Sequence, residues 1–377
     1  MANNTFLTPK IIAKEALTIL QSNTVMAGLV YTDFSNEFGP AKRGDTVAIR
    51  KPASFSAREF DGSIDVQDIK EGRVSLTLDH HLDISTSVTS KEWTLELDDF
   101  ANRIIRPAMV ALNERIDEYI CSLYAQFNQV AGTAGSAPAS LADLANLDKA
   151  MNEARMPTTG RNVVVSPATK AAMFSIDAVA RADARGDNGT ALRDASMGYI
   201  MGASWYMDQN IKSHVAGTAQ TVTALAVNGA VEAGADSMSL SGGSGDETLL
   251  AGDVFSVAGV EGSFTVTEDS KAASGAFTLV KFAPAAPEGG FADKAAITVQ
   301  PGHAANMAFV REAIALAIVP LELPRGASGN AAYVSYNGMG IRVVQGYDIN
   351  TKTDTISFDM LLGAKVIDPR LGVRFMA

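Results

Sequence analysis

The longest amphipathic stretch of the sequence lies between Leu95 and Val130. Apolar side chains recur there at a mean step close to the 3.6 residues of an α-helix. These positions are Leu97, Phe100, Ile104, Ala108, Leu112, Ile116, Tyr119, Leu123, Phe127 and Val130. At ~1.5 Å per residue the helix would extend roughly 50 Å, several times the length of a usual globular helix. The sequence therefore predicts one long helix that needs a large surface to lie along.

Pro107 lies inside this predicted helix. Because proline has no N–H to bond back one turn, we expect the helix to bend near Ile104. The opposite face is polar, and we expect it to be exposed to water or to contact a neighbouring subunit. Its residues are Asn102, Arg103, Arg106, Asn113, Glu114 and Asp117.

A chain of 377 residues is long enough for two or three domains. Since no run of about 18 apolar residues occurs, no segment is expected to cross a membrane. The N-terminus lacks the regions of a signal peptide, so we expect synthesis and folding in the cytoplasm. The single cysteine, Cys121, is expected to be a small buried hydrophobic residue. The net charge of −11 argues against binding nucleic acid through phosphate contacts.

The negative charge is concentrated between Val215 and Pro301. This segment has ten acidic residues, three lysines and no arginine, and it contributes −7 of the net −11. Short β-type runs alternate there with glycine and serine clusters, and they span Ser237–Ser241, Val254–Val257, Ser263–Thr267, Ala276–Phe282 and Ala295–Val299. The pattern predicts a separate domain that is a small all-β barrel or sandwich.

Two projecting elements are predicted before the long helix. Residues Thr8–Leu20 form an amphipathic helix that begins with the Thr8–Pro9 cap, and this helix is an N-terminal arm. A strand over Thr46–Arg50 is followed by a long strand over Arg73–Val88, where apolar residues alternate with a period of two. Because a long two-stranded hairpin is marginal in isolation, we expect this arm to lie on a neighbouring molecule.

The segments on both sides of the acidic one predict a discontinuous α+β domain. Before it, a helix is expected over Leu141–Ala154, and a strand over Asn162–Val165 leads into a helix over Ala168–Ile176. We expect a mobile loop over Ala180–Asp194. After the acidic segment, strands are expected over Ala332–Tyr336, Gly340–Gln345, Thr355–Leu361 and Gly363–Ile367, the first two joined by an Asn337–Gly338 turn.

The sequence has no recognisable catalytic or metal-binding motif. Its four histidines are His80, His81, His214 and His303, and no HxxxH or CxxC spacing occurs. The glycine-rich stretch Gly242–Asp246 lacks the Lys-Ser/Thr pair of a phosphate loop. We therefore expect no catalytic, cofactor-binding or metal-binding residues, no cofactor and no enzyme activity.

The layout resembles the major capsid (coat) protein of tailed bacteriophages, in the branch that has an inserted β-barrel domain. The similar stretches follow one another through nearly the whole chain, and they are Thr89–Glu92, Leu97–Phe100, Pro107, Leu249–Val260, Asn306–Phe309, Arg311–Leu316 and Pro320–Leu321. Val310 departs from the pattern, since the resemblance implies a polar residue there.

The resemblance implies an α+β tailed-phage capsid fold with five parts. Residues 1–36 are an N-terminal arm, 37–90 an extended β-hairpin loop over the adjacent subunit, 91–131 a long spine helix, 132–216 and 303–377 the discontinuous central α+β peripheral and axial domains, and 217–302 the inserted small all-β domain.

The resemblance also implies a function. The chain would be a major capsid protein that self-assembles into an icosahedral shell enclosing phage double-stranded DNA. Its partners would be other copies of itself in pentamers and hexamers, a scaffolding protein and the portal during assembly, and packaged DNA without specific binding. No membrane partner is implied. The protein would be located in the virion after assembly in the host cytoplasm.

Two other functions remain open. A cellular nanocompartment shell protein shares the implied fold, although the β insert argues against it. A secreted β-rich binding or adhesion protein would fit the Gly/Ser/Thr-rich acidic segment. The missing signal peptide and disulfides argue against that alternative.

Overall fold

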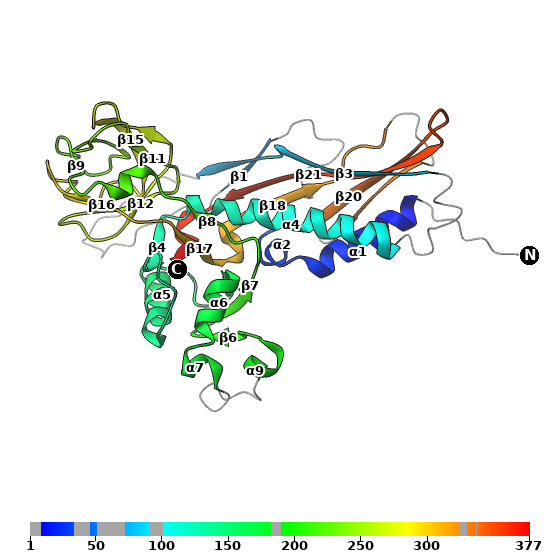
Figure 1. The fold of residues 1–377 in the computed structure, drawn as a ribbon, viewed down its shortest axis with the longest axis horizontal. Helices are drawn as coiled ribbons and strands as arrows, with labels where there is room; N and C mark the ends of the chain where they lie inside the picture. Colours follow the sequence, from blue (N-terminus) through cyan, green and yellow to red (C-terminus); the bar gives the residue numbers. More distant parts are fainter. Residues whose placement is uncertain are drawn as a thin grey trace, which may run out of the picture. The chain divides into compact units, whose positions relative to one another are not determined.

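The computed structural model describes residues 9–33, 46–50, 72–89, 101–181, 190–324, 330–336 and 338–377. The chain has a mixed α+β fold that is rich in strands (Figure 1). It divides into two compact units: unit 1 comprises Met1–Ile116 and Ile314–Ile367, and unit 2 comprises Asp117–Ala313 and Asp368–Ala377. Among the described residues, no helix is long and apolar enough to cross a membrane.

In the described part of unit 1, five strands form an antiparallel sheet around β21 (Thr353–Val366). β3 (His80–Thr89) pairs with one edge of β21 over ten residues. Along its other edge, β21 pairs with β20 (Met339–Asp348) in its N-terminal half and with β18 (Ile314–Val319) in its C-terminal half. β19 (Ala331–Tyr336) completes the sheet beside β20.

The strand predicted over Arg73–Val88 is two strands in the structure. β2 (Arg73–Thr77) pairs with β1 (Thr46–Arg50), whereas β3 belongs to the sheet around β21. The chain changes sheets where it crosses β21 at Gly363, whose Cβ, if present, would lie 2.0 Å from the carbonyl oxygen of Thr77. The prediction of one long two-stranded arm was therefore wrong for its second half. The segment that joins β1 to β2 lies outside the described residues.

Two helices at the N-terminal side belong to unit 1. α1 (Pro9–Asn23) confirms the predicted N-terminal helix, and Thr8 itself lies outside the described residues. Its buried apolar residues include Ile12, Ala13, Ala16, Leu17, Ile19 and Leu20. α2 (Met26–Leu29) follows, and Tyr31 then exchanges backbone hydrogen bonds with Ile314 and Leu316 beside β18.

The predicted long helix has three parts. A π-turn, η2 (Ala101–Ile105), leads into α4 (Arg106–Ser122), and a 3₁₀ turn, η3 (Leu123–Gln126), follows. Pro107 is the second residue of α4. The wider π-turn lies immediately before it, where the missing N–H of proline would interrupt an α-helical ladder. The irregular turn thus includes Ile104, where we expected the bend.

The C-terminal end of this helix was predicted wrongly. Phe127 is extended, and Val130 lies in β4 (Gln129–Gly132) of the unit 2 sheet. The side chain of Phe127 is fully buried against Gly372. Residues 95–100 of the predicted helix lie outside the part of the chain that the structure describes.

The polar face of α4 is only partly exposed. Arg103, Arg106 and Glu114 are exposed as predicted. Asn113 and Asp117 are buried instead, with 6% and 2% of their surface exposed. The hydroxyl of Thr24, which follows α1, donates to the side-chain oxygen Oδ1 of Asn113 at 2.6 Å.

In the part of unit 2 that the structure describes, seven strands form a mixed sheet. Its strands in spatial order are β4, β22 (Gly372–Met376), β17 (His303–Val310), β5 (Arg161–Val165), β7 (Ala203–Met207) and β6 (Tyr199–Ile200), and β8 (Ser213–His214) also pairs with β17. α5 (Leu141–Glu153), β5 and α6 (Pro167–Met173) confirm the predicted elements. Val310, the departure from the family pattern, is buried in this core.

Short helical turns complete unit 2. They are α7 (Asp177–Ala180), α9 (Thr190–Asp194), η5 (Arg311–Ala313) and η6 (Pro369–Leu371). The segment predicted as a loop over Ala180–Asp194 thus ends in a helix, and residues 182–189 within it lie outside the described residues.

Asn306 joins the sheet to the start of α6. Its side-chain nitrogen donates to the carbonyl oxygen of Phe375 and to the hydroxyl of Thr169, both at 3.1 Å. Its side-chain oxygen accepts from the N–H of Ser166 at 2.7 Å. Ser166 in turn caps α6, because its hydroxyl accepts from the Thr169 N–H at 3.2 Å.

The acidic segment folds as a small barrel, one of the two all-β forms that the sequence predicts. Six strands pair in the order β16 (Ile297–Val299), β12 (Val254–Val257), β13 (Phe264–Val266), β15 (Phe277–Ala283), β10 (Ser237–Ser241) and β9 (Ala226–Val227). A bridge between Ala226 and Ala296 closes this sheet. The turn η4 (Thr218–Thr221) and the pair β11 (Thr248–Leu249) and β14 (Ser270–Lys271) lie beside it.

Aromatic side chains fill the barrel. Phe264 lies at the centre of this cluster, with its ring centroid 5.0 to 5.8 Å from those of Phe255, Phe282 and Phe291. These side chains are at most 2% exposed, so the barrel has its own core. The boundaries of the barrel as an inserted domain remain a prediction.

The last predicted hairpin is confirmed. Tyr336 at the end of β19 pairs with Met339 at the start of β20. Gly338 adopts φ +77°, a left-handed conformation that suits a two-residue hairpin turn. Asn337 lies outside the described residues. The two strands predicted over Thr355–Leu361 and Gly363–Ile367 are one continuous strand, β21.

We expect Gly372→Ala to destabilise unit 2. The added Cβ would lie 2.1 Å from Cε1 of the fully buried Phe127, so the ring must move. Overpacking of this kind costs about 1–3 kcal/mol, which urea denaturation followed by circular dichroism can measure. Gly245→Ala is the matched control, because nothing lies within 4 Å of its Cβ position. Equal stability of the two variants would contradict the close packing at Gly372.

Candidate functional site

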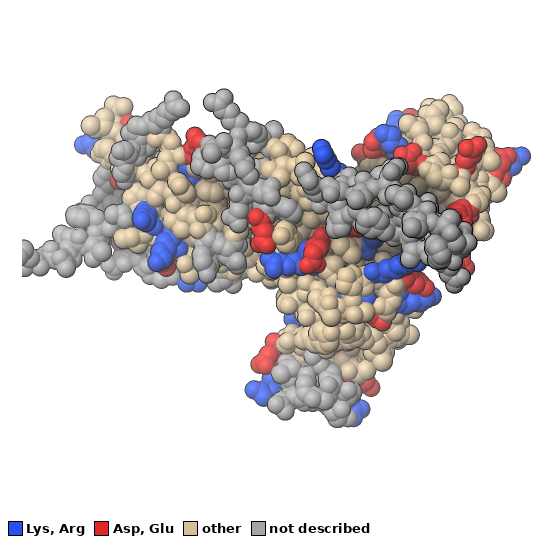
Figure 2. Space-filling model, turned by 180° about the vertical axis from the view of Figure 1, so that it is seen from behind, with Lys and Arg blue, Asp and Glu red and all other residues tan. Residues whose placement is uncertain are grey.

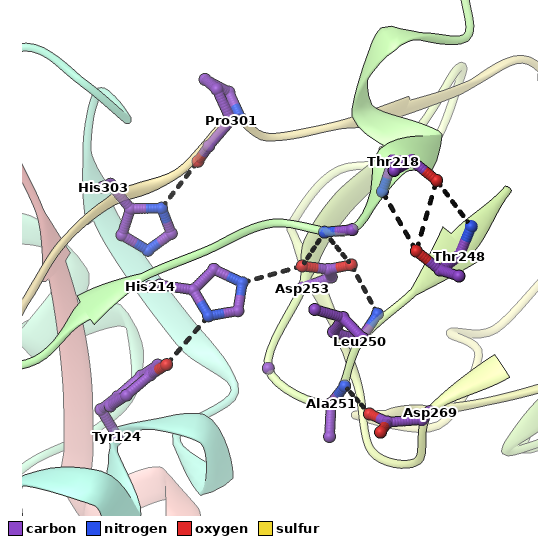
Figure 3. Close-up of polar contacts among 12 residues, drawn as sticks. Tyr124, His214, Thr218, Thr248, Leu250, Ala251, Asp253, Asp269, Pro301 and His303 are labelled. Atoms are coloured by element: carbon purple, nitrogen blue, oxygen red, sulfur yellow. Dashed lines mark hydrogen bonds and ion pairs between the residues drawn. The ribbon is translucent and has the colours of Figure 1, made fainter.

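A buried polar cluster lies in unit 2 where the chain enters and leaves the barrel (Figure 3). His214 ends β8 and His303 begins β17, and the two residues are direct partners in the antiparallel pairing of these strands. Their ring centroids are 5.3 Å apart. Both side chains are 4% exposed. The two histidines thus mark the entry to and the exit from the barrel.

His214 connects two other segments through its ring nitrogens. Its Nε2 lies 2.8 Å from Oδ1 of Asp253, which precedes β12. Its Nδ1 lies 2.9 Å from the hydroxyl of Tyr124 in η3. A carboxylate can only accept, so Nε2 carries the hydrogen and Nδ1 accepts from the tyrosine hydroxyl when the ring is neutral. The result is a directed chain of hydrogen bonds from Tyr124 to Asp253.

The Asp253 carboxylate is completely buried and has several donors. Besides His214, the N–H of Gly217 donates to its two oxygens at 3.2 and 3.1 Å. The N–H of Leu250 donates to Oδ2 at 2.8 Å. A buried carboxylate needs such donors, because leaving water costs an ion several kcal/mol.

Arg374 supplies the positive charge near this carboxylate. Its side chain is 0% exposed. Nη1 donates to the carbonyl oxygen of Gly252 at 2.6 Å, and Nη2 donates to that of Tyr124 at 3.1 Å. The guanidinium also lies over the Tyr124 ring, 4.9 Å from its centroid. Burial lowers the pKa of Arg374 to about 10, and Asp253 opposes that shift, so the side chain is charged at neutral pH.

His303 is less completely bonded than His214. Its Nδ1 lies 2.9 Å from the Pro301 carbonyl oxygen, which fixes the hydrogen of the neutral ring on Nδ1. Nε2 is buried and has no partner among the residues that the structure describes. Burial lowers the pKa of His303 to about 4. The hydrogen bond to Pro301 opposes this shift, and electrostatic interactions with Arg374 and His214 add to it. The ring is therefore neutral at pH 7.

Asp253, His214 and Tyr124 are hydrogen-bonded in the same sequence of residue types as a catalytic acid–base relay. The burial of these side chains argues for a structural role instead. The His214 ring is nearly sealed from solvent and Asp253 fully so, which leaves no approach for a substrate. Burial also raises the pKa of the Tyr124 hydroxyl, so it is a poor nucleophile at neutral pH. The cluster is best explained as packing between the barrel and the unit 2 sheet.

The other candidate residues from the sequence lie apart from this cluster. His80 and His81 are exposed neighbours on β3 in unit 1. Cys121 is 1% exposed, as predicted, and burial together with Asp208 and Asp117 raises its pKa. Within the described residues, no group of three or more His, Cys, Asp and Glu is arranged to hold a metal ion.

Exposed apolar side chains gather at two strand ends. Tyr347 and Ile349 lie at the turn between β20 and β21 and are 53% and 76% exposed. Tyr199 and Tyr206 lie on the neighbouring strands β6 and β7 and are 69% and 38% exposed. Acidic and basic side chains are interspersed over the described surface that Figure 2 shows. Exposed aromatic residues of this kind are typical of protein contacts.

We expect Cys121 to be unreactive in the folded protein. Its burial blocks access, and its raised pKa lowers the fraction of thiolate, which is the reactive form. Labelling by a disulfide reagent near pH 8 should be roughly a hundredfold slower than in the denatured protein. The chain has one cysteine, so Cys121→Ala measures the background. Labelling at the denatured rate would show that α4 does not bury this side chain.

Comparisons with known proteins bear on the fold. No family model matches the sequence, and no curated protein matches it. Among solved structures, one from Mycobacterium phage Che8 superposes with a TM-score of 0.53 at 16% identity, covering 93% of this chain and 90% of the other.

Two weaker matches have TM-scores below 0.5. The capsid structure of the cyanophage P-SCSP1u has a TM-score of 0.47 at 13% identity, with 89% of this chain and 84% of the other covered. A virus-like particle from Pyrococcus furiosus has a TM-score of 0.46 at 8% identity, with 97% of each chain covered. The resemblance to tailed-phage proteins that the sequence predicts is confirmed at the level of the fold, which this chain shares with the structure from phage Che8.

Proposed function

We propose that this chain is the major capsid protein of a tailed bacteriophage, which self-assembles into an icosahedral shell around double-stranded DNA. The observation that carries the proposal is the fold shared with the phage Che8 structure, which covers 93% of this chain. The stretches Leu97–Phe100, Leu249–Val260 and Asn306–Phe309, which are similar to those of the coat-protein family, support it.

The exposed apolar strand ends suit a protein that contacts copies of itself. Each patch is small, so a single contact made by Tyr347 and Ile349 or by Tyr199 and Tyr206 would be weak. A closed shell repeats the same contact many times, and closure prevents dissociation one subunit at a time. Weak contacts also let misplaced subunits leave during assembly.

The proposed parts follow the family pattern. Residues 37–90 lie over the adjacent subunit, the helix within 91–131 is the spine, and the barrel within 217–302 supports the subunit or its neighbours. Other copies, a scaffolding protein and the portal are the assembly partners, in the host cytoplasm. The net charge of −11 supports a shell wall that encloses DNA without binding it tightly.

Negative-stain electron microscopy tests this proposal. The purified chain, with or without its scaffolding protein, should form large particles of uniform diameter. A monodisperse 39.6 kDa monomer in the presence of the scaffold would overturn it. The contents of nuclease-treated particles distinguish the alternatives, since protected double-stranded DNA favours a virion and an enclosed enzyme favours a nanocompartment.

A deletion within the proposed loop separates folding from assembly. β1 and β2 pair up to Arg50 and Arg73, so removing residues 54–72 leaves three residues to close a short hairpin. We expect the variant to be soluble, with the circular dichroism spectrum and melting temperature of the parent protein, yet to form no shells. Insoluble protein would mean that the segment belongs to the core, and normal shells would mean that it makes no essential subunit contact.

A further inference from the structure

The connection between the barrel and the rest of unit 2 is much more tightly packed than a linker requires. Three glycines lie around His214, and a Cβ at each would be crowded. A Cβ on Gly217 would lie 2.2 Å from the Thr248 carbonyl oxygen, and one on Gly302 would lie 2.9 Å from the His214 carbonyl oxygen. A Cβ on Gly252 would lie 3.1 Å from Cβ of Ala125. The entry strand, the exit strand and a barrel loop are therefore in close contact at one place.

The polar contacts at this place join segments that the chain separates widely. Asp253 and Gly252 belong to the barrel, whereas Tyr124 and Arg374 belong to η3 and β22. His214 bonds to the barrel on one side and to η3 on the other. Arg374 also bonds to both segments, because its guanidinium donates to the carbonyl oxygen of Gly252 in the barrel and to that of Tyr124 in η3. Each of these two residues thus holds the barrel loop and η3 together.

We propose that Tyr124, His214, Asp253 and Arg374 form a latch that holds the base of the barrel against the unit 2 sheet, and that acid opens this latch through protonation of His303. The proposal does not rest on the function proposed above, because it concerns contacts within one chain. It assigns the cluster a conformational role, which is to let the barrel move as a folded body when the latch opens.

The surroundings of His303 explain why acid would open the latch. The titratable groups that act on it are Arg374 from β22, His214 from β8 and Asp253 from the barrel loop, and the Pro301 carbonyl oxygen, which accepts from Nδ1, favours the protonated ring. Two of these groups are cationic or basic, and the carboxylate of Asp253 already accepts from His214, Gly217 and Leu250. A proton on the unpartnered Nε2 would add a second buried positive charge beside Arg374.

Two further groups complete the electrostatic environment. The Tyr124 hydroxyl contacts His214 and has a raised pKa, so it stays neutral and does not compensate a new cation. Lys212, two residues before His214, forms an ion pair with Glu118 of α4. The Glu118 carboxylate is therefore already occupied.

The sign of the pH effect follows from the pKa of His303. It is about 4 in the closed latch and 6.5 in an ordinary solvated histidine. The neutral ring is favoured in the closed state, so the latch is fully stable above pH 6.5 and loses stability as the pH falls from 6.5 toward 4. Proton binding at His303 is coupled to opening of the latch, because the pKa differs between the closed and the open state. The equilibrium constant for opening is therefore roughly twentyfold larger at about pH 5 than at about pH 7.

Hydrogen exchange of the full-length protein, read by mass spectrometry and corrected for intrinsic rates, tests the latch at neutral pH. In Asp253→Asn the amides of residues 213–217, 250–253 and 302–305 should exchange at least tenfold faster, while β12, β13 and β15 stay protected. Asp246→Asn is the matched control, since it makes the same change at an exposed ion pair with Lys271 and should alter nothing in these segments. Tyr124→Phe removes one hydroxyl and should give a smaller increase at 213–217.

A second variant, His303→Gln, tests whether acid opens the latch. The parent protein should show faster exchange in the three latch segments at about pH 5 than at about pH 7, by roughly twentyfold. His303→Gln cannot take up a proton and should keep its neutral-pH protection. Unchanged exchange in the parent protein, or an equal acid response in His303→Gln, would overturn the acid switch. Loss of protection in the barrel strands of Asp253→Asn would overturn the latch, because the cluster would then belong to the barrel core.

Discussion

The described structure of unit 2 depends on the buried guanidinium of Arg374. This side chain lies on β22, between β4 and β17, and it has no exposed surface. Taking a cation out of water costs several kcal/mol, so its contacts must replace water on every side. The carbonyl oxygens of Gly252 and Tyr124, the Tyr124 ring and the nearby charge of Asp253 do this for most of the group, whereas Nε is buried without a hydrogen-bond partner among the described residues. A hydrophobic residue could fill the same space, but it would not require the barrel loop and η3 to meet at one point.

The elements that the sequence predicts well are those whose signals are local. α6 begins at a serine followed by a proline, and the serine hydroxyl caps it as the pattern indicates. β10 and β12 have the predicted bounds because glycine and serine clusters end each strand. α5 and β5 also agree within one residue, since Ser140 and Asp143 form a capping box at the start of α5, and β5 lies between Gly160 and the Ser166–Pro167 cap of α6. In these places neighbouring residues decide the structure, and distant contacts only select among compatible packings.

The wrong predictions come from patterns that two structures satisfy equally. The period of two continues from β2 into β3, so nothing in it marks the change of sheet at Gly363. Val130 continues the helical step of three to four residues and also suits the strand β4, and only pairing with β22 distinguishes them. The buried side chain of Asn113 is hydrogen-bonded to Thr24, which is 89 residues away in the sequence.

The polar cluster was not predicted, because its members are far apart in the sequence and have no motif spacing. Tyr124, His214, Asp253 and Arg374 come from four segments that only the folded chain brings together. One signal was present. His214 and His303 lie just outside the two ends of the acidic segment, so a charge boundary coincided with a pair of titratable residues.

The pairing of β3 with β21 has a consequence for protein synthesis. β3 ends at Thr89 and its partner ends at Val366, so about 280 residues must be added before the pair can be completed. At the usual 5–20 residues per second, this takes roughly 14–55 s. During that time the nascent β3 has a free edge and alternating apolar residues, and it can pair with another chain on the same messenger RNA. The yield of folded protein should then depend on translation speed and on chaperones that cover strand edges.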